Sequence, residues 1–280
     1  MRTPENAVIE IEDLHYTYRD GTRALKGLSL SIPRGSRVAI LGPNGAGKST
    51  LLLHLNGLYL PQRGKVRVAG LEVNARTARE IKARVGLVFQ DPDDQVFSAT
   101  VAEDVAFGPV NMGLSPQEVE RRVQEALAAV NMEAYRDKAP YHLSYGQKKR
   151  VAIAGVLAMG PEIIVLDEPM AYLDPLGQDT LLEILNRLHR RGTTILVATH
   201  DVDMAAAWAD RVVIVQDGHT LAQGSPSLLV QEELIRQASL RFPLVTRIFR
   251  SLPELGLSTT PYTVEQAVAF LKDLLVDGRV

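Results

Sequence analysis

The chain of 280 residues contains no cysteine, and aromatic residues make up only 5% of it. Without cysteine there is no disulfide framework, no thiolate zinc site and no cysteine nucleophile. The 31 Lys and Arg residues nearly balance the 33 Asp and Glu residues, so the formal net charge is −2. Because there is no basic excess, we expect no nucleic acid partner, and any phosphate group must be bound by a local site.

A long apolar run is also missing. The longest apolar stretch, 151–166, is interrupted by Pro161 and Glu162 and is shorter than the roughly 20 residues that a membrane-spanning helix needs. The N-terminal MRTPEN has no apolar core of the kind found in signal peptides, so we expect the protein to stay inside the cell. With 46% hydrophobic and 23% charged residues, the composition predicts one large or two modest folded domains.

Short apolar runs that alternate with helical patterns predict an α/β fold. The runs that lack polar alternation are typical of buried parallel strands, and they are 37–41, 85–89, 163–166 and 194–198. The helical patterns are 47–55, 115–130, 147–159 and 177–190. Near the N-terminus, 7–11 and 28–32 resemble strands separated by an Asp20-Gly21 turn, which predicts antiparallel β structure.

A glycine-rich segment, GPNGAGKST at 42–50, matches the phosphate-loop pattern between a predicted strand and a predicted helix. Glycines allow successive backbone N–H groups to converge on phosphate oxygens, while Lys48 supplies a cation and Ser49 offers Mg²⁺ an oxygen. The alternative is a turn that binds nothing, but the flanking strand and helix favour phosphate binding. The candidate phosphate-binding residues are Gly42, Pro43, Asn44, Gly45, Ala46, Gly47, Lys48, Ser49 and Thr50.

Two carboxylates, Asp167 and Glu168, directly follow the apolar run 163–166. Asp167 can support Mg²⁺ through its water shell, and Glu168 can polarise the water that attacks a γ-phosphate. Alone, the pair is also compatible with a solvated loop after a strand. Together with the phosphate loop, it indicates nucleotide hydrolysis.

Between these two elements, Leu143-Ser144-Tyr145-Gly146-Gln147 resembles the LSGGQ signature of ATP-binding-cassette (ABC) ATPases, and other marks of that family follow in order. Gln90 resembles the glutamine of the Q-loop, and Leu173-Asp174 resembles the end of the D-loop. His200 resembles the switch histidine, and Tyr18 stands where the family places an aromatic residue that stacks on adenine. The resemblance covers about residues 7–225.

This resemblance implies a P-loop NTPase fold of the ABC type with a mixed central sheet, in which ATP and Mg²⁺ are bound. Metal contacts are expected from Ser49, Gln90 and Asp167, and catalytic roles from Lys48, Glu168 and His200. It also implies a head-to-tail dimer with a second copy or a paralogue. In that dimer, Ser144, Gly146 and Gln147 of one subunit face the ATP held by the phosphate loop of the other.

The chain departs from the family pattern at the first glycine of the signature, which is Tyr145, and in the D-loop, which carries Met170 and Tyr172. All three are expected near the dimer interface. Tyr145 either hinders closure of the dimer or points away and packs harmlessly, and we favour the second interpretation. If the changes slow turnover, Tyr145→Gly should alter the ATPase rate.

Residues 89–101, FQDPDDQVFSATV, resemble the segment that follows the Q-loop in energy-coupling-factor (ECF) importers. This resemblance implies that Gln95 lies on a short helix that meets a transmembrane scaffold, with a substrate-specific membrane subunit as further partner. The expected location is therefore peripheral, on the cytoplasmic face of the membrane. Val96 and Phe97 are expected to be exposed for docking. Within this group, the chain is most similar to the ATPase of cobalt or nickel importers, and the ATPase of an ECF vitamin importer is the alternative.

A soluble ABC ATPase acting on nucleic acid or the ribosome is the alternative from another class. Against it, the segment 90–143 has no sustained heptads, and the chain has one cassette. The expected domains are a cassette at 1–225, with a helical subdomain at about 91–160, and a small C-terminal helical appendage at 226–280. Its helical runs, 229–240, 243–252 and 263–275, are expected to add dimer contacts or to pack against the cassette.

Overall fold

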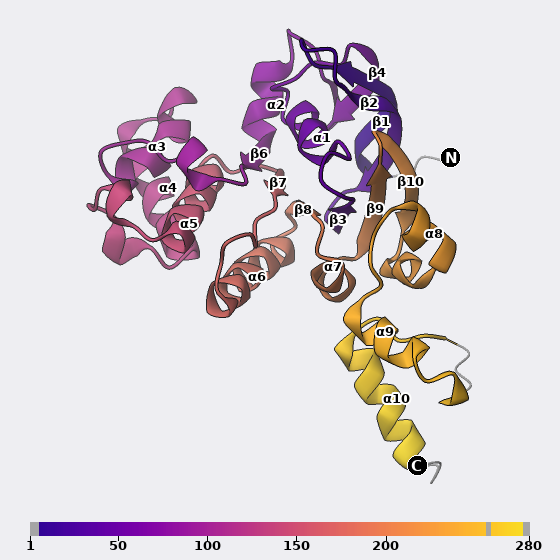
Figure 1. Ribbon diagram of the computed structural model, residues 1–280. Coiled ribbons are helices and arrows are strands. Elements are labelled where there is room, and N and C mark those ends of the chain that lie inside the picture. The colour runs from indigo at the N-terminus through magenta and orange to yellow at the C-terminus, as the bar shows by residue number, and fades with distance from the viewer. Residues whose placement is uncertain (1–5, 256–258, 277–280) are drawn as a thin grey trace.

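The computed structural model describes residues 6–255 and 259–276 (Figure 1). In this part of the chain the strands form two sheets, and the smaller one is antiparallel with the order β2-β1-β4-β5. Its strands are β1 (Ala7–Thr17), β2 (Arg23–Pro33), β4 (Arg63–Val68) and β5 (Leu71–Glu72). The predicted N-terminal hairpin is confirmed, and both strands are longer than expected because pairing continues to Thr17 and Arg23 beside the turn.

The larger sheet has the order β10-β9-β3-β8-β7-β6. All neighbours in it are parallel except β9 and β10, so the predicted mixed sheet is confirmed. Its strands are β3 (Arg37–Leu41), β6 (Val85–Val88), β7 (Ile163–Asp167), β8 (Thr194–Thr199), β9 (Arg211–Gln216) and β10 (His219–Gly224). Because β3, β7 and β8 are adjacent and parallel, the loops that follow them meet at one edge of the sheet.

Helix α1 (Lys48–Leu55) lies in the first of two hydrophobic cores. Leu51, Leu52 and Leu55 are buried there with residues from the antiparallel sheet and from one face of the mixed sheet. The same core contains Ile81 of α2 (Ala78–Arg84). This packing fixes the start of α1, and with it the phosphate loop, between the two sheets.

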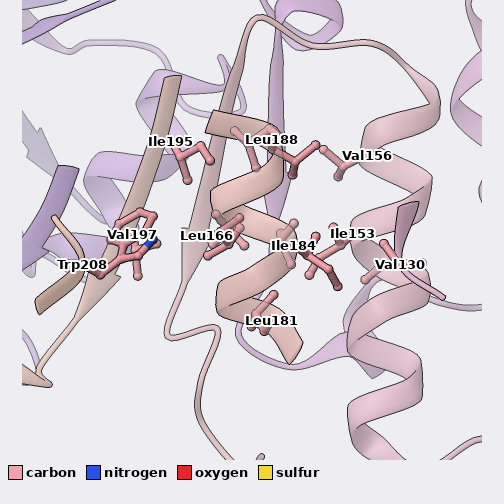
Figure 2. Packing of buried hydrophobic residues seen from close by; sticks show 14 of the residues in the cluster. Val130, Ile153, Val156, Leu166, Leu181, Ile184, Leu188, Ile195, Val197 and Trp208 are labelled. Carbon is pink, nitrogen blue, oxygen red and sulfur yellow. The ribbon is translucent and has the colours of Figure 1, made fainter. Parts of the chain in front are cut away.

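The second core joins the other face of the mixed sheet to the helices that lie between β6 and β9 in the chain. These are α3 (Val101–Asn111), α4 (Pro116–Ala129), α5 (Tyr145–Ala158), α6 (Pro175–Arg190) and α7 (Val202–Trp208). Figure 2 shows Ile184 and Leu188 of α6 on the side that faces Ile153 and Val156 of α5. Helices α3 to α5 gather beyond the β6 edge in Figure 1 and occupy the region in which a helical subdomain was expected.

The C-terminal part contains a 3₁₀ turn at Pro226–Val230 and the helices α8 (Glu232–Gln237), α9 (Leu244–Arg250) and α10 (Val264–Val276). Helices are confirmed in each of the three predicted runs, although the first run is divided between the turn and α8. Figure 1 shows α9 and α10 extending away from the two sheets. The amide of Leu244 donates to Asp203 at 2.6 Å, which attaches α9 to α7. Among the described residues, no helix is both long and apolar enough to cross a membrane.

Candidate functional site

The phosphate loop connects β3 to α1, and close backbone neighbours require two of its glycines. A Cβ atom on Gly42 would lie 2.2 Å from the carbonyl oxygen of Val215, and one on Gly47 would lie 2.7 Å from that of Ala24. Gly47 also has φ = 103° as the residue before the first turn of α1. No side chain caps this helix, so its first N–H groups are available to a phosphate.

Lys48 is held inside the loop rather than extended into solvent. Its Nζ donates to the carbonyl oxygens of Gly42 at 2.7 Å and Pro43 at 3.2 Å, and it lies 3.8 Å from Oε1 of Glu168. Only 6% of the residue is exposed. Burial lowers the pKa of Lys48, and the carboxylates of Glu168 and Asp167 oppose that effect. A triphosphate beside this ammonium group would stabilise its charged form.

Asp167 and Glu168 stand at the end of β7, as predicted. Burial raises the pKa of Asp167, while a hydrogen bond with Ser49 works in the opposite direction. The amide of Glu168 donates to Ala198 of β8 at 2.9 Å, which fixes the residue to the neighbouring strand. Glu168 has a positive φ of 41°, a conformation that is costly for a residue with a side chain and that is found preferentially at functional sites.

The last residue of β8 and the residue after it orient the Glu168 carboxylate. The Thr199 hydroxyl donates to Oε2 at 3.1 Å, and Nδ1 of His200 donates to Oε1 at 2.9 Å. His200 was selected from the sequence, but Thr199 was not, because a threonine at the end of an apolar strand carries no distinctive signal. Glu168 is therefore held by groups that lie more than thirty residues further along the chain.

A cavity of about 260 Å³ brings most of the predicted ATP-site residues together, but its lining does not include Gly42, Pro43, Ala46 or His200. Its predicted lining residues are Tyr18, Asn44, Gly45, Gly47, Lys48, Ser49, Thr50, Gln90, Asp167 and Glu168. Thr22, Arg23 and Ala24 also line it and were missed, since they belong to the hairpin turn and to β2. At one end of the cavity, the Tyr18 hydroxyl lies 2.7 Å from Oγ1 of Thr50. The Tyr18 ring meets that of Tyr16 edge to face, with 5.2 Å between centroids.

The signature residues line a different cavity, of about 530 Å³. Ser144 is the N-cap of α5: its Oγ accepts from the amide of Gln147 at 3.3 Å, while Oε1 of Gln147 accepts from the amide of Ser144 at 2.9 Å. Because of this capping box, α5 begins at Tyr145, two residues earlier than predicted. The side-chain oxygen of Gln147 is thus engaged within its own subunit.

One expectation about side chains near the Q-loop is wrong, and it concerns Val96. The Tyr145 hydroxyl donates to the carbonyl oxygen of Gln90 at 3.0 Å, so the side chain packs within its own subunit, and its effect on dimer closure stays a prediction. Val96 is buried at 9% exposure, whereas Phe97 is 65% exposed, so only the second of these neighbours faces solvent. Gln95 directly follows a 3₁₀ turn at Pro92–Asp94. Its side chain donates to the carbonyl oxygen of Leu87 on β6 and accepts from the amide of Phe89, the residue after β6.

Ser49, Gln90 and Asp167 lie in the smaller cavity and offer only oxygen ligands suited to a hard cation: a hydroxyl, an amide carbonyl and a carboxylate. Mg²⁺ is characteristically bound by one or two protein groups together with substrate phosphates and water. The donor set therefore fits Mg²⁺ that enters with a nucleotide.

The parallel sheet, the phosphate loop and the two carboxylates define a P-loop nucleoside triphosphatase. The family model described as "ABC transporter" matches residues 25–171. The energy-coupling factor transporter ATP-binding protein EcfA of Carboxydothermus hydrogenoformans is 54% identical over 255 residues, which are 91% of this chain and 94% of the relative. EcfA of Methanocaldococcus jannaschii is 50% identical over 248 residues, covering 88% and 89% of the two chains.

Solved structures show the same kinship. A structure of cbiO1 from Clostridium perfringens, part of the ABC transporter complex cbiONQ, has a TM-score of 0.75 at 42% identity and covers 88% of this chain and 100% of its own. A dimeric post-hydrolysis cassette bound to ADP and Pi has a TM-score of 0.71 at 30% identity, covering 78% and 98%. The chain belongs to the ABC transporter family, among the ATP-binding subunits of energy-coupling-factor transporters, and it is an ATPase.

Proposed function

We propose that this chain is the ATP-hydrolysing subunit of an ECF importer that drives uptake of a transition-metal cation, cobalt or nickel, through membrane partners. The observation that carries the hydrolytic part is the convergence of Lys48, Glu168 and His200 where three adjacent strands end. Phosphoryl transfer to water requires positioned charges more than covalent chemistry, and this arrangement supplies them.

In the proposed reaction, the backbone of 42–50 and the Lys48 ammonium bind the phosphates, and the Tyr18 ring stacks on adenine. Glu168 orients and polarises the attacking water, and His200 contacts the γ-phosphate. Ser49, Gln90 and Asp167 would hold Mg²⁺, which supplies positive charge to the β- and γ-phosphates when bound.

The dimer is proposed from the separation of the two cavities. Ser144 and Gly146 line a different cavity from the phosphate loop, so a single chain does not bring the signature to its own ATP site. The start of the 14-residue helix α5 presents N–H groups and positive dipole charge suited to a phosphate. A head-to-tail pairing with a second copy or a paralogue would place that helix start against the ATP of the other subunit. The dimeric cassette found with ADP and Pi supports this arrangement.

A third cavity, of about 350 Å³, is proposed to receive the transmembrane scaffold. It lies between β6 and the helices α3 and α5, and Phe97 and Phe107 contribute to its lining. These two rings meet edge to face at 5.1 Å and are more than half exposed. Adjacent exposed aromatic side chains at a cavity are typical of protein docking sites. Docking would keep the chain peripheral, on the cytoplasmic face of the membrane.

The buried carboxylate of Asp104 shapes that docking site. Its oxygens accept from the amides of Phe97 at 3.1 Å and Ser98 at 3.0 Å, so the loop that presents Phe97 is tied to α3. Phe107→Asp should abolish recruitment to membranes that contain the scaffold while ATP binding is retained. Val264→Asp, at an exposed apolar position on α10, is the matched control.

The cargo is assigned from resemblance alone, because the ATPase subunit does not touch it. The metal assignment rests on the likeness of the Q-loop segment to cobalt and nickel importers, and a vitamin importer is the alternative. Purification of the tagged chain from gently solubilised membranes of its native host, followed by mass spectrometry and metal analysis, distinguishes them. A scaffold with a metal-specific subunit supports the proposal. Several small vitamin-binding subunits would contradict it, and recovery only in the soluble fraction would contradict the transport function.

A further inference from the structure

The tyrosine in the signature joins two segments that serve different ATP sites in the proposed dimer. Tyr145 is the first residue of α5, and its hydroxyl donates to the carbonyl oxygen of Gln90, 55 residues earlier, at 3.0 Å. Gln90 lines the cavity of its own phosphate loop, whereas Tyr145 lines the cavity of the signature. A glycine at position 145 would have no side chain with which to make this contact.

Lys149, one helical turn further along α5, binds the same carbonyl oxygen. Its Nζ donates to Gln90 and, at 3.4 Å, to the carbonyl oxygen of Phe89. Lys149 is 1% exposed, and its Nζ lies 5.6 Å from the centroid of the Tyr145 ring. Burial lowers the pKa of Lys149 to about 8, although Asp91 and Asp167 oppose this effect. A lysine buried this deeply requires specific acceptors, and the backbone at Gln90 provides one.

Further contacts surround the Tyr145–Gln90 hydrogen bond. The Tyr172 ring from the D-loop meets the Tyr145 ring edge to face, at 5.5 Å between centroids, and Tyr172 has a positive φ of 62°. On the other side, Nζ of Lys148 lies 2.6 Å from Oδ1 of Asp93. The first turn of α5 is therefore bonded directly to the chain at Gln90 and Asp93, and it packs against the D-loop.

We propose that Tyr145 and Lys149 are positioning residues that fix the Gln90 backbone to the signature helix α5. When the signature of a subunit binds the ATP held by its partner, this connection transmits the event to the subunit's own ATP site. In a head-to-tail dimer, the signature contacts the ATP of the partner and Gln90 contacts the subunit's own ATP. A displacement of α5 on dimer closure carries the Gln90 carbonyl with it. The two ATP sites then act cooperatively. This inference rests on the proposed dimer.

Tyr145→Phe tests the inference because it removes the hydroxyl and keeps the ring. Tyr141→Phe, at a tyrosine that is 74% exposed, is the matched control. In steady-state ATPase assays of the full-length chain, the Hill coefficient for ATP should fall from about 2, the number of sites, toward 1 in Tyr145→Phe, and it should stay unchanged in the control. The maximal rate should fall by less than about threefold, because no group that contacts the phosphates is removed.

A double-mutant cycle with Gln90→Ala separates positioning from simple packing. Gln90→Ala keeps the main-chain carbonyl but removes the side chain that is proposed to contact Mg²⁺. If Tyr145 acts by positioning that side chain, Tyr145→Phe should have no further effect on the Hill coefficient in the Gln90→Ala background. Additive effects, an unchanged Hill coefficient in Tyr145→Phe, or a wild-type coefficient of about 1 would each overturn the inference. Failure of the wild type to hydrolyse ATP or to dimerise with ATP would instead contradict the proposed function. Thermal melting of each variant identifies a folding defect, in which case Lys149→Met is tested in the same way.

Discussion

Glu168 accepts a hydrogen bond from Nδ1 of His200 at 2.9 Å through the carboxylate oxygen that lies 3.8 Å from Nζ of Lys48. This oxygen, Oε1, is therefore hydrogen-bonded to His200 and lies near the Lys48 ammonium group. The other oxygen, Oε2, accepts a hydrogen bond from the Thr199 hydroxyl at 3.1 Å. A carboxylate fixed at both oxygens is well placed to orient a water molecule in a single direction.

Glu168→Gln should therefore reduce ATP turnover by about 100- to 10,000-fold, the scale on which a general base contributes. The amide has nearly the same shape, so ATP binding should persist and an ATP-bound dimer should accumulate. Phosphate release measures the turnover, and size-exclusion chromatography with ATP and Mg²⁺ measures the dimer. Glu72→Gln, at an exposed position on β5, is the control. Undiminished hydrolysis in Glu168→Gln would contradict the role assigned to this residue.

Two glycine substitutions should change stability in opposite directions. Gly42→Ala places a methyl group 2.2 Å from the Val215 carbonyl, so the backbone must shift and the free energy of unfolding should fall by about 1–3 kcal/mol. At Gly155, inside α5, the new methyl would meet the Asp104 carbonyl at 3.7 Å, an ordinary contact. Gly155→Ala should therefore stabilise the protein by about 0.5–1 kcal/mol. Urea unfolding measures both, and a loss of stability in Gly155→Ala would contradict the close-packing argument.

Local patterns in the sequence were sufficient to predict the phosphate loop and the parallel strands β3, β6, β7 and β8, because their residues are contiguous and their spacing is diagnostic. The parallel strand β9 was missed. Helix α3 was missed because its Gly108-Pro109 pair is typical of a helix end, yet the helix continues to Asn111. Its long-range packing outweighs that preference, and Val101 and Val105 are buried in the second core. Local propensity is a weak guide where tertiary contacts decide.

Contacts between distant parts of the chain were beyond local patterns. The Tyr145 hydroxyl meets the Gln90 carbonyl across 55 residues, and Thr199 meets Glu168 across 31. Residue type does not identify a backbone carbonyl as a partner, so a tyrosine in place of glycine suggested only bulk. The register of β7 beside β8 sets the second contact, and register between parallel strands depends on the whole sheet.

Asp167→Asn should stabilise the nucleotide-free protein while abolishing hydrolysis. Burial raises the pKa of Asp167 in the folded state, so the ionised carboxylate costs stability at neutral pH. Below the ordinary carboxyl pKa of 3.8 both states are protonated and this cost vanishes, so the advantage of the variant should shrink as the pH falls. Thermal melting between about pH 4 and pH 7 should show a Tm gain on the order of 2 °C at pH 7 that shrinks toward the acidic end of the range.

The control for that experiment is Asp137→Asn, because the Asp137 side chain is 95% exposed. It should leave the Tm unchanged at both ends of the range. A lower Tm for Asp167→Asn at pH 7 would show that contacts of the carboxylate outweigh the cost of its burial.

Lys149 should make the stability of the protein rise with pH in the alkaline range. Its pKa is lowered from 10.5 to about 8 in the folded state, so between those values the unfolded chain binds more protons and stability increases with pH. Below about pH 8 both states are charged, and the cost of the buried ammonium group is present in full. The free energy of unfolding of the wild type, relative to Lys149→Met, should therefore rise between pH 8 and 10 by up to about 3 kcal/mol.

Urea unfolding across this range measures the slope, with Lys65→Met at an exposed lysine as the control for loss of a charge. Parallel curves for the wild type and Lys149→Met would mean that the carbonyl groups of Gln90 and Phe89 fully offset the burial of the charge.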